Sequence, residues 1–105
     1  MNRLETARAT LTGPGKWTKD QFHTPKGVRH CLIGAMFGQL AGTGYDTDAT
    51  PEVSILVEVI TDQYPERTWG RNTGAIIMFN DHRDTKFADV DRVLDKAVVK
   101  SQELI

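Results

Sequence analysis

Apolar residues recur at steps of three and four along the C-terminal stretch of the chain. The apolar positions are Phe87, Val90, Leu94, Ala97, Val98 and Leu104. Polar residues such as Asp91, Asp95 and Lys96 occupy positions between them. This spacing predicts an amphipathic helix, which gains most of its stability when its apolar face packs against another element. The rest of the chain must therefore supply a matching apolar surface.

An internal stretch from Val28 to Leu40 shows the same period. Its apolar positions are Cys31, Leu32, Ala35, Met36 and Leu40. We predict that it forms the central helix of the fold, packed by helices over residues 51–64 and 87–104. Within it, Gly34 and Gly38 form a G-x-x-x-G pattern. In a stretch too short to span a bilayer, this pattern favours the close approach of a neighbouring helix in the same molecule.

A third stretch, from Pro51 to Tyr64, has an arguable type. Its sequence "VSILVEVI" is rich in β-branched residues, which are typical of buried strands. Its apolar residues nevertheless share one helical face: Val53, Leu56, Val57, Ile60 and Tyr64. Thr50 is a candidate N-cap, and proline suits the first helical position. We therefore predict a helix over residues 51–64 and keep a strand as the alternative.

The remaining segments are shorter. Asn2 is a candidate N-cap for a helix from Arg3 to Leu11, and the apolar run from Gly74 to Phe79 is predicted to be helical, with a strand as its alternative. The stretch from Lys16 to Gly27 shows no period and is expected to be a loop or a short hairpin. The sequence thus predicts an all-α fold: one domain over residues 1–105, with four to five helices and an irregular segment or hairpin near residues 16–27.

Charge and hydropathy exclude several classes of function. The 105 residues include 13 Lys plus Arg and 14 Asp plus Glu, so the formal net charge is −1 and no overall field attracts polyanions. The longest apolar run, Cys31 to Phe37, is far below the roughly 18 residues of a membrane-spanning helix, and the first residues lack a signal-peptide core. We expect a cytoplasmic protein in which Cys31 is buried and unreactive.

Asn80, Asp81 and His82 form the stretch that most resembles a reactive site. His82, Asp81 and Asp84, joined in space by His30 or His23, could ligate a metal or arrange a general base with its orienting carboxylate. Such sites usually bring their ligands at a short regular spacing such as H-x-x-x-H, which this chain lacks.

The structural interpretation of the same stretch needs no chemistry. Asn80 and Asp81 are residue types that favour turns, and Asp84 or Thr85 can cap the helix that follows. We therefore predict a structural turn with no metal and no cofactor. A small metal-dependent or hydrolytic enzyme centred on Asp81 and His82 remains the alternative.

The absence of a recognisable catalytic motif favours a non-enzymatic protein-binding module. Because aromatic residues dominate binding hot spots, the expected contacts are Trp17, Tyr45 and Trp69, although tryptophan is more often buried in the core. The other alternative is nucleic-acid binding through a local patch of Arg67, Arg71, Arg83 and Lys86. Neighbouring carboxylates offset these cations, so we do not expect that function.

The order of the segments resembles that of a family of small uncharacterised proteins, a domain of unknown function found in actinobacteria and their phages. A Trp-containing loop, a "CLIGAM" helix, an Asn-Asp pair after an apolar turn and a final "VLDKA" helix carry the resemblance. The matching residues are Trp17, Cys31, Leu32, Gly34, Ala35, Asn80, Asp81, Val90, Leu94, Asp95 and Ala97.

This chain departs from the family pattern at Phe79, where the family typically has a tryptophan. The resemblance implies a compact helical domain and an actinobacterial or phage origin. It implies no activity, cofactor or site. For a phage-encoded protein of this kind, we expect the partner to be a host protein.

Overall fold

The computed structural model describes residues 2–103, which fold into five α-helices joined by loops and short 3-10 turns. The helices are α1 (Arg3–Thr10), α2 (Leu32–Phe37), α3 (Pro51–Gln63), α4 (Thr73–Asp81) and α5 (Phe87–Glu103). Within this range there is no strand, which confirms the predicted all-α class. None of these helices combines the length and the apolar character needed to cross a membrane.

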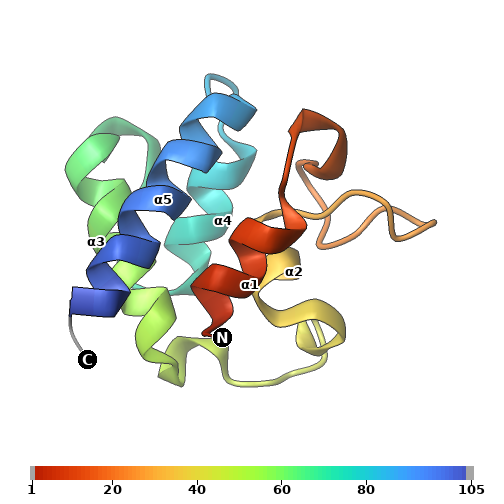
Figure 1. The fold of residues 1–105 in the computed structure, drawn as a ribbon, viewed down its shortest axis with the longest axis horizontal. Coiled ribbons are helices and arrows are strands. Elements are labelled where there is room, and N and C mark those ends of the chain that lie inside the picture. Colours follow the sequence, from red (N-terminus) through yellow and green to blue (C-terminus); the bar gives the residue numbers. More distant parts are fainter. Residues whose placement is uncertain (1, 104–105) are drawn as a thin grey trace.

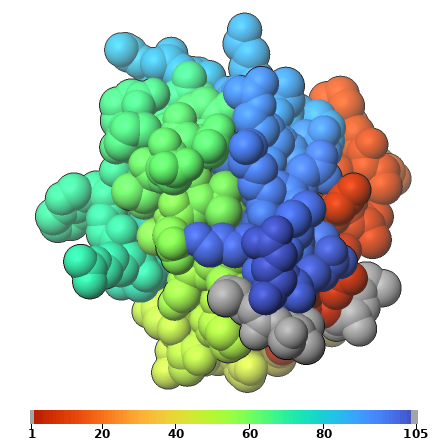
Figure 2. Space-filling view, turned by 60° about the vertical axis from the view of Figure 1, so that its left-hand side comes forward, coloured from red at the N-terminus to blue at the C-terminus, as the bar shows by residue number. Residues whose placement is uncertain are grey.

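Helix α5 lies along α3 and α1, as Figures 1 and 2 show, and its apolar face forms much of the core. The buried positions of this face are Val90, Val93, Leu94, Ala97 and Val98. The predicted helix is therefore confirmed, except that Leu104 lies outside the described residues. Helix α4 packs against α3 and α2.

The first helix begins where the sequence predicts. Asn2 Oδ1 accepts the backbone N–H of Glu5 at 2.9 Å, and Glu5 Oε1 accepts the backbone N–H of Asn2 at 2.9 Å. This reciprocal pair satisfies two backbone donors at the start of α1. The side-chain Nδ2 of Asn2 also donates to Ser101 Oγ at 3.0 Å. The cap therefore also joins the first helix to the last.

Helix α2 is shorter than the predicted stretch from Val28 to Leu40. It begins only at Leu32 because the preceding backbone groups bond to a distant loop: His30 N–H donates to Lys16 O at 2.8 Å, and Cys31 N–H donates to Phe22 O at 3.1 Å. The predicted partners of this helix were also wrong, since α2 packs mainly on α1 and α4. All six of its residues are nevertheless buried, so it is central to the core.

The two glycines of the G-x-x-x-G pattern have different roles. A Cβ on Gly34 would lie 2.1 Å from the backbone oxygen of Phe22, so only glycine allows this approach. Gly38 has a φ of 58° and ends α2 in the left-handed region that favours glycine. The neighbour that the pattern admits is therefore the loop at Phe22, and the expected neighbouring helix was wrong.

The two segments for which a strand was the alternative form helices α3 and α4. Residues 51–63 and 73–81 are both helical, which confirms the predicted helices. Thr50 occupies the N-cap position of α3, but its hydroxyl donates to Thr47 O at 2.8 Å and caps no helical N–H. Helix α4 extends beyond the predicted Phe79, so Asn80 and Asp81 lie in its last turn.

Residues 11–31 form the irregular part of the fold, which extends away from the helices in Figure 1. Two isolated bridges join Trp17 to His30 and His23 to His30. The expectation of an irregular segment near residues 16–27 is thus confirmed, and the hairpin alternative is reduced to these bridges.

Candidate functional site

Asn80 is a buried polar residue whose side chain binds three separate segments. It is 1% exposed. Its Oδ1 accepts the indole N–H of Trp17 at 2.8 Å and the backbone N–H of Leu32 at 3.0 Å. Its Nδ2 donates to Thr18 O at 3.1 Å and to Asp81 Oδ1 at 2.9 Å. Both lone pairs and both amide hydrogens are therefore used, which leaves this amide with no free group for a ligand.

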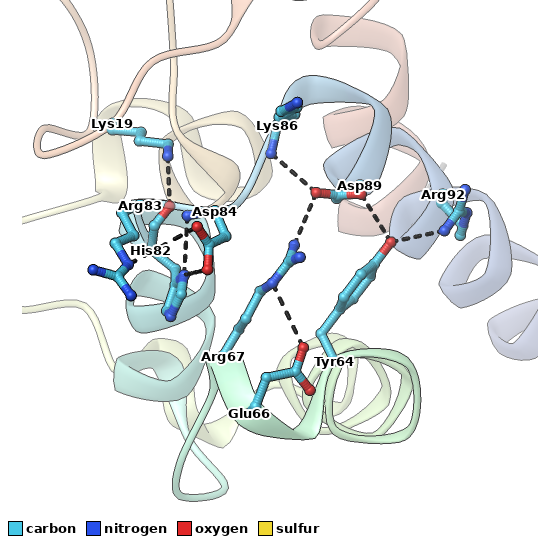
Figure 3. A network of polar contacts seen from close by, with 10 residues as sticks. All are labelled: Lys19, Tyr64, Glu66, Arg67, His82, Arg83, Asp84, Lys86, Asp89 and Arg92. Carbon is cyan, nitrogen blue, oxygen red and sulfur yellow. Dashed lines mark hydrogen bonds and ion pairs between the residues drawn. The ribbon is translucent and has the colours of Figure 1, made fainter.

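Asp81 and His82 also bind backbone groups of nearby segments. Asp81 Oδ1 accepts the backbone N–H of Asp20, a residue with a φ of 67°, at 2.9 Å. His82 is the C-cap of α4, and its Nδ1 accepts the N–H of Asp84 at 3.1 Å. Lys19 Nζ donates to the carbonyl of His82, as Figure 3 shows. These contacts make the stretch a junction between α4, the irregular segment and the start of α5.

The structure does not group the three histidines. His23 and His30 face each other with their Nδ1 atoms 2.6 Å apart, whereas the side-chain contacts of His82 are with Asp84. Among residues 2–103 no group of three or more His, Cys, Asp or Glu side chains is placed to hold a metal ion. The alternative of a metal site centred on Asp81 and His82 therefore has no set of three ligands in that part of the chain.

The start of α5 is not capped as predicted. Asp89 Oδ2, in the first turn of the helix, accepts the backbone N–H of Lys86 at 3.0 Å. Asp84 accepts no hydrogen bond from the helix, and the hydroxyl of Thr85 is buried without a partner. The prediction that Asp84 or Thr85 is the cap was wrong, because a carboxylate three residues inside the segment reaches back to the free donor.

Asp89 is also the centre of a charged network that the sequence did not indicate (Figure 3). Its carboxylate accepts the Tyr64 hydroxyl at 3.0 Å and Arg67 Nη1 at 2.9 Å, and Arg92 Nη1 donates to the Tyr64 oxygen at 2.9 Å. Burial alone would raise the pKa of Asp89, but hydrogen bonds from Lys86, Arg67 and Tyr64 hold it below its ordinary value. Burial and the Asp89 carboxylate raise the pKa of Tyr64. The network joins the end of α3 to the start of α5.

Three of the four cations proposed as a nucleic-acid patch, Arg67, Arg83 and Arg71, have separate surroundings. Arg67 is paired with Asp89 and lies 3.7 Å from a Glu66 oxygen, so its charge is already neutralised. Arg83 Nε lies 3.9 Å from an Asp84 oxygen, with the Arg83 side chain 90% exposed. Arg71 lies elsewhere, beside a hollow over α3. Phosphate binding usually relies on a cluster of unpaired cations, and these three side chains do not form such a cluster.

The three candidate contact aromatics have very different surroundings. Trp17 is half-buried against the core, with its ring 6.5 Å from that of Phe87 and its N–H bound by Asn80. Tyr45 is 45% exposed and lies 6.0 Å from the Phe37 ring. Trp69 is 81% exposed. Trp17 is therefore a structural residue, and Trp69 is the aromatic most accessible to a partner.

Next to Trp69 in sequence, the loop before α4 forms one wall of a surface hollow of about 670 Å³. The opposite wall is the outer face of α3. The lining residues are Ser54, Val57, Glu58, Thr61, Asp62, Gly70 and Arg71. In Figure 2 the loop near residue 70 projects from the surface beside the green α3. Trp69 does not line the hollow itself but precedes its lining residue Gly70 in the same loop. We call Trp69 together with Glu58, Asp62 and Arg71 the Trp69 surface.

We expect the Asp81 and His82 side chains to contribute unequally to stability. Asp81→Ala removes the acceptor of the Asp20 N–H and of one Asn80 amide hydrogen, and should lower the free energy of unfolding by about 1–3 kcal/mol. His82→Ala removes one exposed hydrogen bond and should change it by less than about 1 kcal/mol. Urea titrations of the two variants beside the parent measure the difference. A larger loss in His82→Ala than in Asp81→Ala would contradict these assignments.

Comparison with known proteins agrees with a domain of unknown function. The family described as "Family of unknown function (DUF6197)" matches residues 2–99. No curated protein and no solved structure matches the chain. The match spans all five helices except the end of α5. It therefore includes both Asn80 with its contacts to Trp17, Thr18 and Leu32, and the Trp69 surface.

Proposed function

The chain belongs to the DUF6197 family, whose function is unknown, and we propose that it is a protein-binding module that uses the Trp69 surface. One observation carries the proposal: the Trp69 side chain is 81% exposed in the loop that walls the hollow over α3. Transfer of an exposed indole from water into contact with a partner is favourable, because it buries a large apolar surface. Tryptophan and arginine are also the residue types that most often dominate binding energy.

The loop that carries Trp69 is held at its ends. On one side, the hydroxyl of Thr68 donates to Ala75 O at 2.8 Å. On the other side, Asn72 Oδ1 accepts the N–H of Gly74 at 3.0 Å, and Asp48 Oδ1 accepts the N–H of Thr73 at 2.8 Å. A loop fixed in this way loses little conformational entropy when it binds, which favours affinity.

The charges of the hollow favour a protein partner over a polyanion. Glu58 and Asp62 stand on the α3 wall, and Arg71 stands on the loop wall. Glu58 is paired with Lys100 Nζ, so the hollow carries side chains of both signs, which suit a polypeptide surface that carries both acceptors and donors. Mixed charge of this kind offers a polyanion no continuous positive patch.

The family resemblance extends the proposal to the setting of the protein. The order of the segments resembles proteins of actinobacteria and their phages, and a phage-encoded module of this size would act in the cytoplasm on a host protein. The small size and the balanced net charge of −1 support a binding role of this kind. The partner of the Trp69 surface is then a host protein that presents an apolar side chain flanked by polar groups.

Site-specific photo-crosslinking in cells of the natural host tests the proposal. A benzoylphenylalanine at position 69 should give one discrete crosslinked product, because the ring there would contact the partner directly. The same residue at position 102, an exposed position on α5, is the matched control and should give none. No product from position 69, or the same product from both positions, would contradict the proposed surface.

A further inference from the structure

Two histidines of the irregular segment meet through ring nitrogens. His23 Nδ1 and His30 Nδ1 are 2.6 Å apart, and the two rings are edge to face with centroids 4.9 Å apart. The other nitrogen of His23, Nε2, lies 2.9 Å from the carbonyl oxygen of Gly38 at the end of α2. Both rings are half-buried, so protons from solvent can reach them.

These contacts assign the hydrogens of both rings. A carbonyl oxygen only accepts, so His23 Nε2 must carry a hydrogen. A neutral His23 then has its lone pair on Nδ1, and His30 must donate from its own Nδ1. The one ring nitrogen of the two histidines that keeps an unshared lone pair is therefore His30 Nε2. This is an assignment from hydrogen bonding, which allows only one hydrogen between the two Nδ1 atoms.

The pair lies where the irregular segment closes onto α2. His30 N–H donates to Lys16 O at 2.8 Å, His30 O accepts Thr18 N–H at 3.1 Å, and Cys31 N–H donates to Phe22 O at 3.1 Å. The backbone of Phe22 rests directly on Gly34 of α2. Phe22 and Cys31 also line one small cavity of about 140 Å³. The closed segment therefore helps to cover Cys31, a residue that is 4% exposed.

We propose that the His23–His30 pair makes closure of this segment depend on protons, and that acid opens the segment locally and uncovers Cys31. The first added proton goes to His30 Nε2, where burial, His23 and Lys16 oppose it but the Nδ1–H to Nδ1 hydrogen bond stays intact. A second added proton must go to His23 Nδ1. It would place two hydrogens and two positive charges across the 2.6 Å contact, and the rings would have to separate.

The surroundings of the pair do not compensate the added charge. On the side of α2, His23 lies against Gly34 and the carbonyl of Gly38, which carry no charge, and the charged group acting on His30 is the cation Lys16. Burial first, and then His23 and Lys16, lower the pKa of His30 from its ordinary 6.5. The unfolded or opened chain therefore binds more protons than the closed one as pH falls below about 6.5. Closure is complete above that pH and weakens below it.

Cys31 is the single cysteine of the chain and reports opening directly. Its labelling rate with dithiodipyridine, a thiol reagent that also reacts in acid, would be measured between about pH 7.5 and pH 5. Each rate is divided by that of the chain in guanidinium chloride at the same pH, which removes the effect of thiol ionisation. Protection should fall by about tenfold or more over this range, while far-UV circular dichroism stays constant.

Two variants and one control make the test specific. His30→Gln and His23→Gln each remove one ring of the pair and should weaken the pH dependence of protection, because two positive charges can then no longer meet across the Nδ1 contact. His82→Gln changes the remaining histidine of the chain and should keep the parent's dependence. Constant protection of the parent down to pH 5, an equal pH dependence in all three variants, or a loss of helical signal that parallels the loss of protection would each overturn the proposal.

Discussion

Replacing Asn80 with alanine is expected to lower the free energy of unfolding by about 3–5 kcal/mol, because each buried group left unpaired costs about 1–3 kcal/mol. The groups concerned are the indole N–H of Trp17, the backbone N–H of Leu32 and the carbonyl of Thr18. Alanine supplies neither acceptor nor donor, and water has little access to a position that is 1% exposed. The loss should therefore exceed that of a typical single hydrogen bond.

Equilibrium unfolding in urea measures this loss, and two further variants divide it. Asn80→Asp keeps the oxygen that binds Trp17 and Leu32 but sets a buried carboxylate oxygen against Thr18 O and Asp81 Oδ1, so at neutral pH it should cost at least as much as alanine. Trp17→Phe removes the indole donor while keeping a ring against the core, and should cost less than Asn80→Ala. A loss below about 1 kcal/mol for Asn80→Ala would show that this junction does not hold the segments together.

Replacing Leu94 with alanine should lower the free energy of unfolding by about 2–5 kcal/mol, the usual range for a leucine truncated in a packed core. Leu94 is 1% exposed on the face of α5 that packs against the other helices, so the truncation leaves a cavity. Lys96→Ala on the exposed side of the same helix is the control and should stay within about 0.5 kcal/mol of the parent. Equal melting temperatures for Leu94→Ala and Lys96→Ala would show that the apolar face of α5 is misassigned.

The sequence predicts the longer helices well because their own periodicity encodes which face is buried. In α5 and α3 the apolar spacing identifies residues such as Leu94 and Leu56, both of which are buried. Helix α2 is different. The predicted helix included residues 28–31, but the backbone N–H groups of His30 and Cys31 donate to Lys16 O and Phe22 O in the irregular segment. A local pattern carries no information about such partners, and so the predicted helix was too long.

The candidate sites show the same division between local and long-range information. The "FNDH" stretch stands out from its residue types, yet the partner of Asn80 is Trp17, 63 residues away. In the Asp89 network, Asp89 contacts Arg67 and Tyr64, which precede it by 22 and 25 positions, and no sequence motif predicts these contacts. The two tryptophans lie in loops of similar composition, and only the packing of the fold separates the half-buried Trp17 from the exposed Trp69.

The most direct test of the proposed function is the effect of Trp69→Ala on binding to the protein that crosslinks at position 69. Binding of the purified partner would be measured by titration for the parent, Trp69→Ala and Gln102→Ala, together with the melting temperature of each. We predict that Trp69→Ala weakens binding by at least about 30-fold, the loss of roughly 2 kcal/mol expected of a hot-spot tryptophan, at an unchanged melting temperature. Gln102→Ala should bind as the parent does. Parent-like affinity in Trp69→Ala would contradict the account.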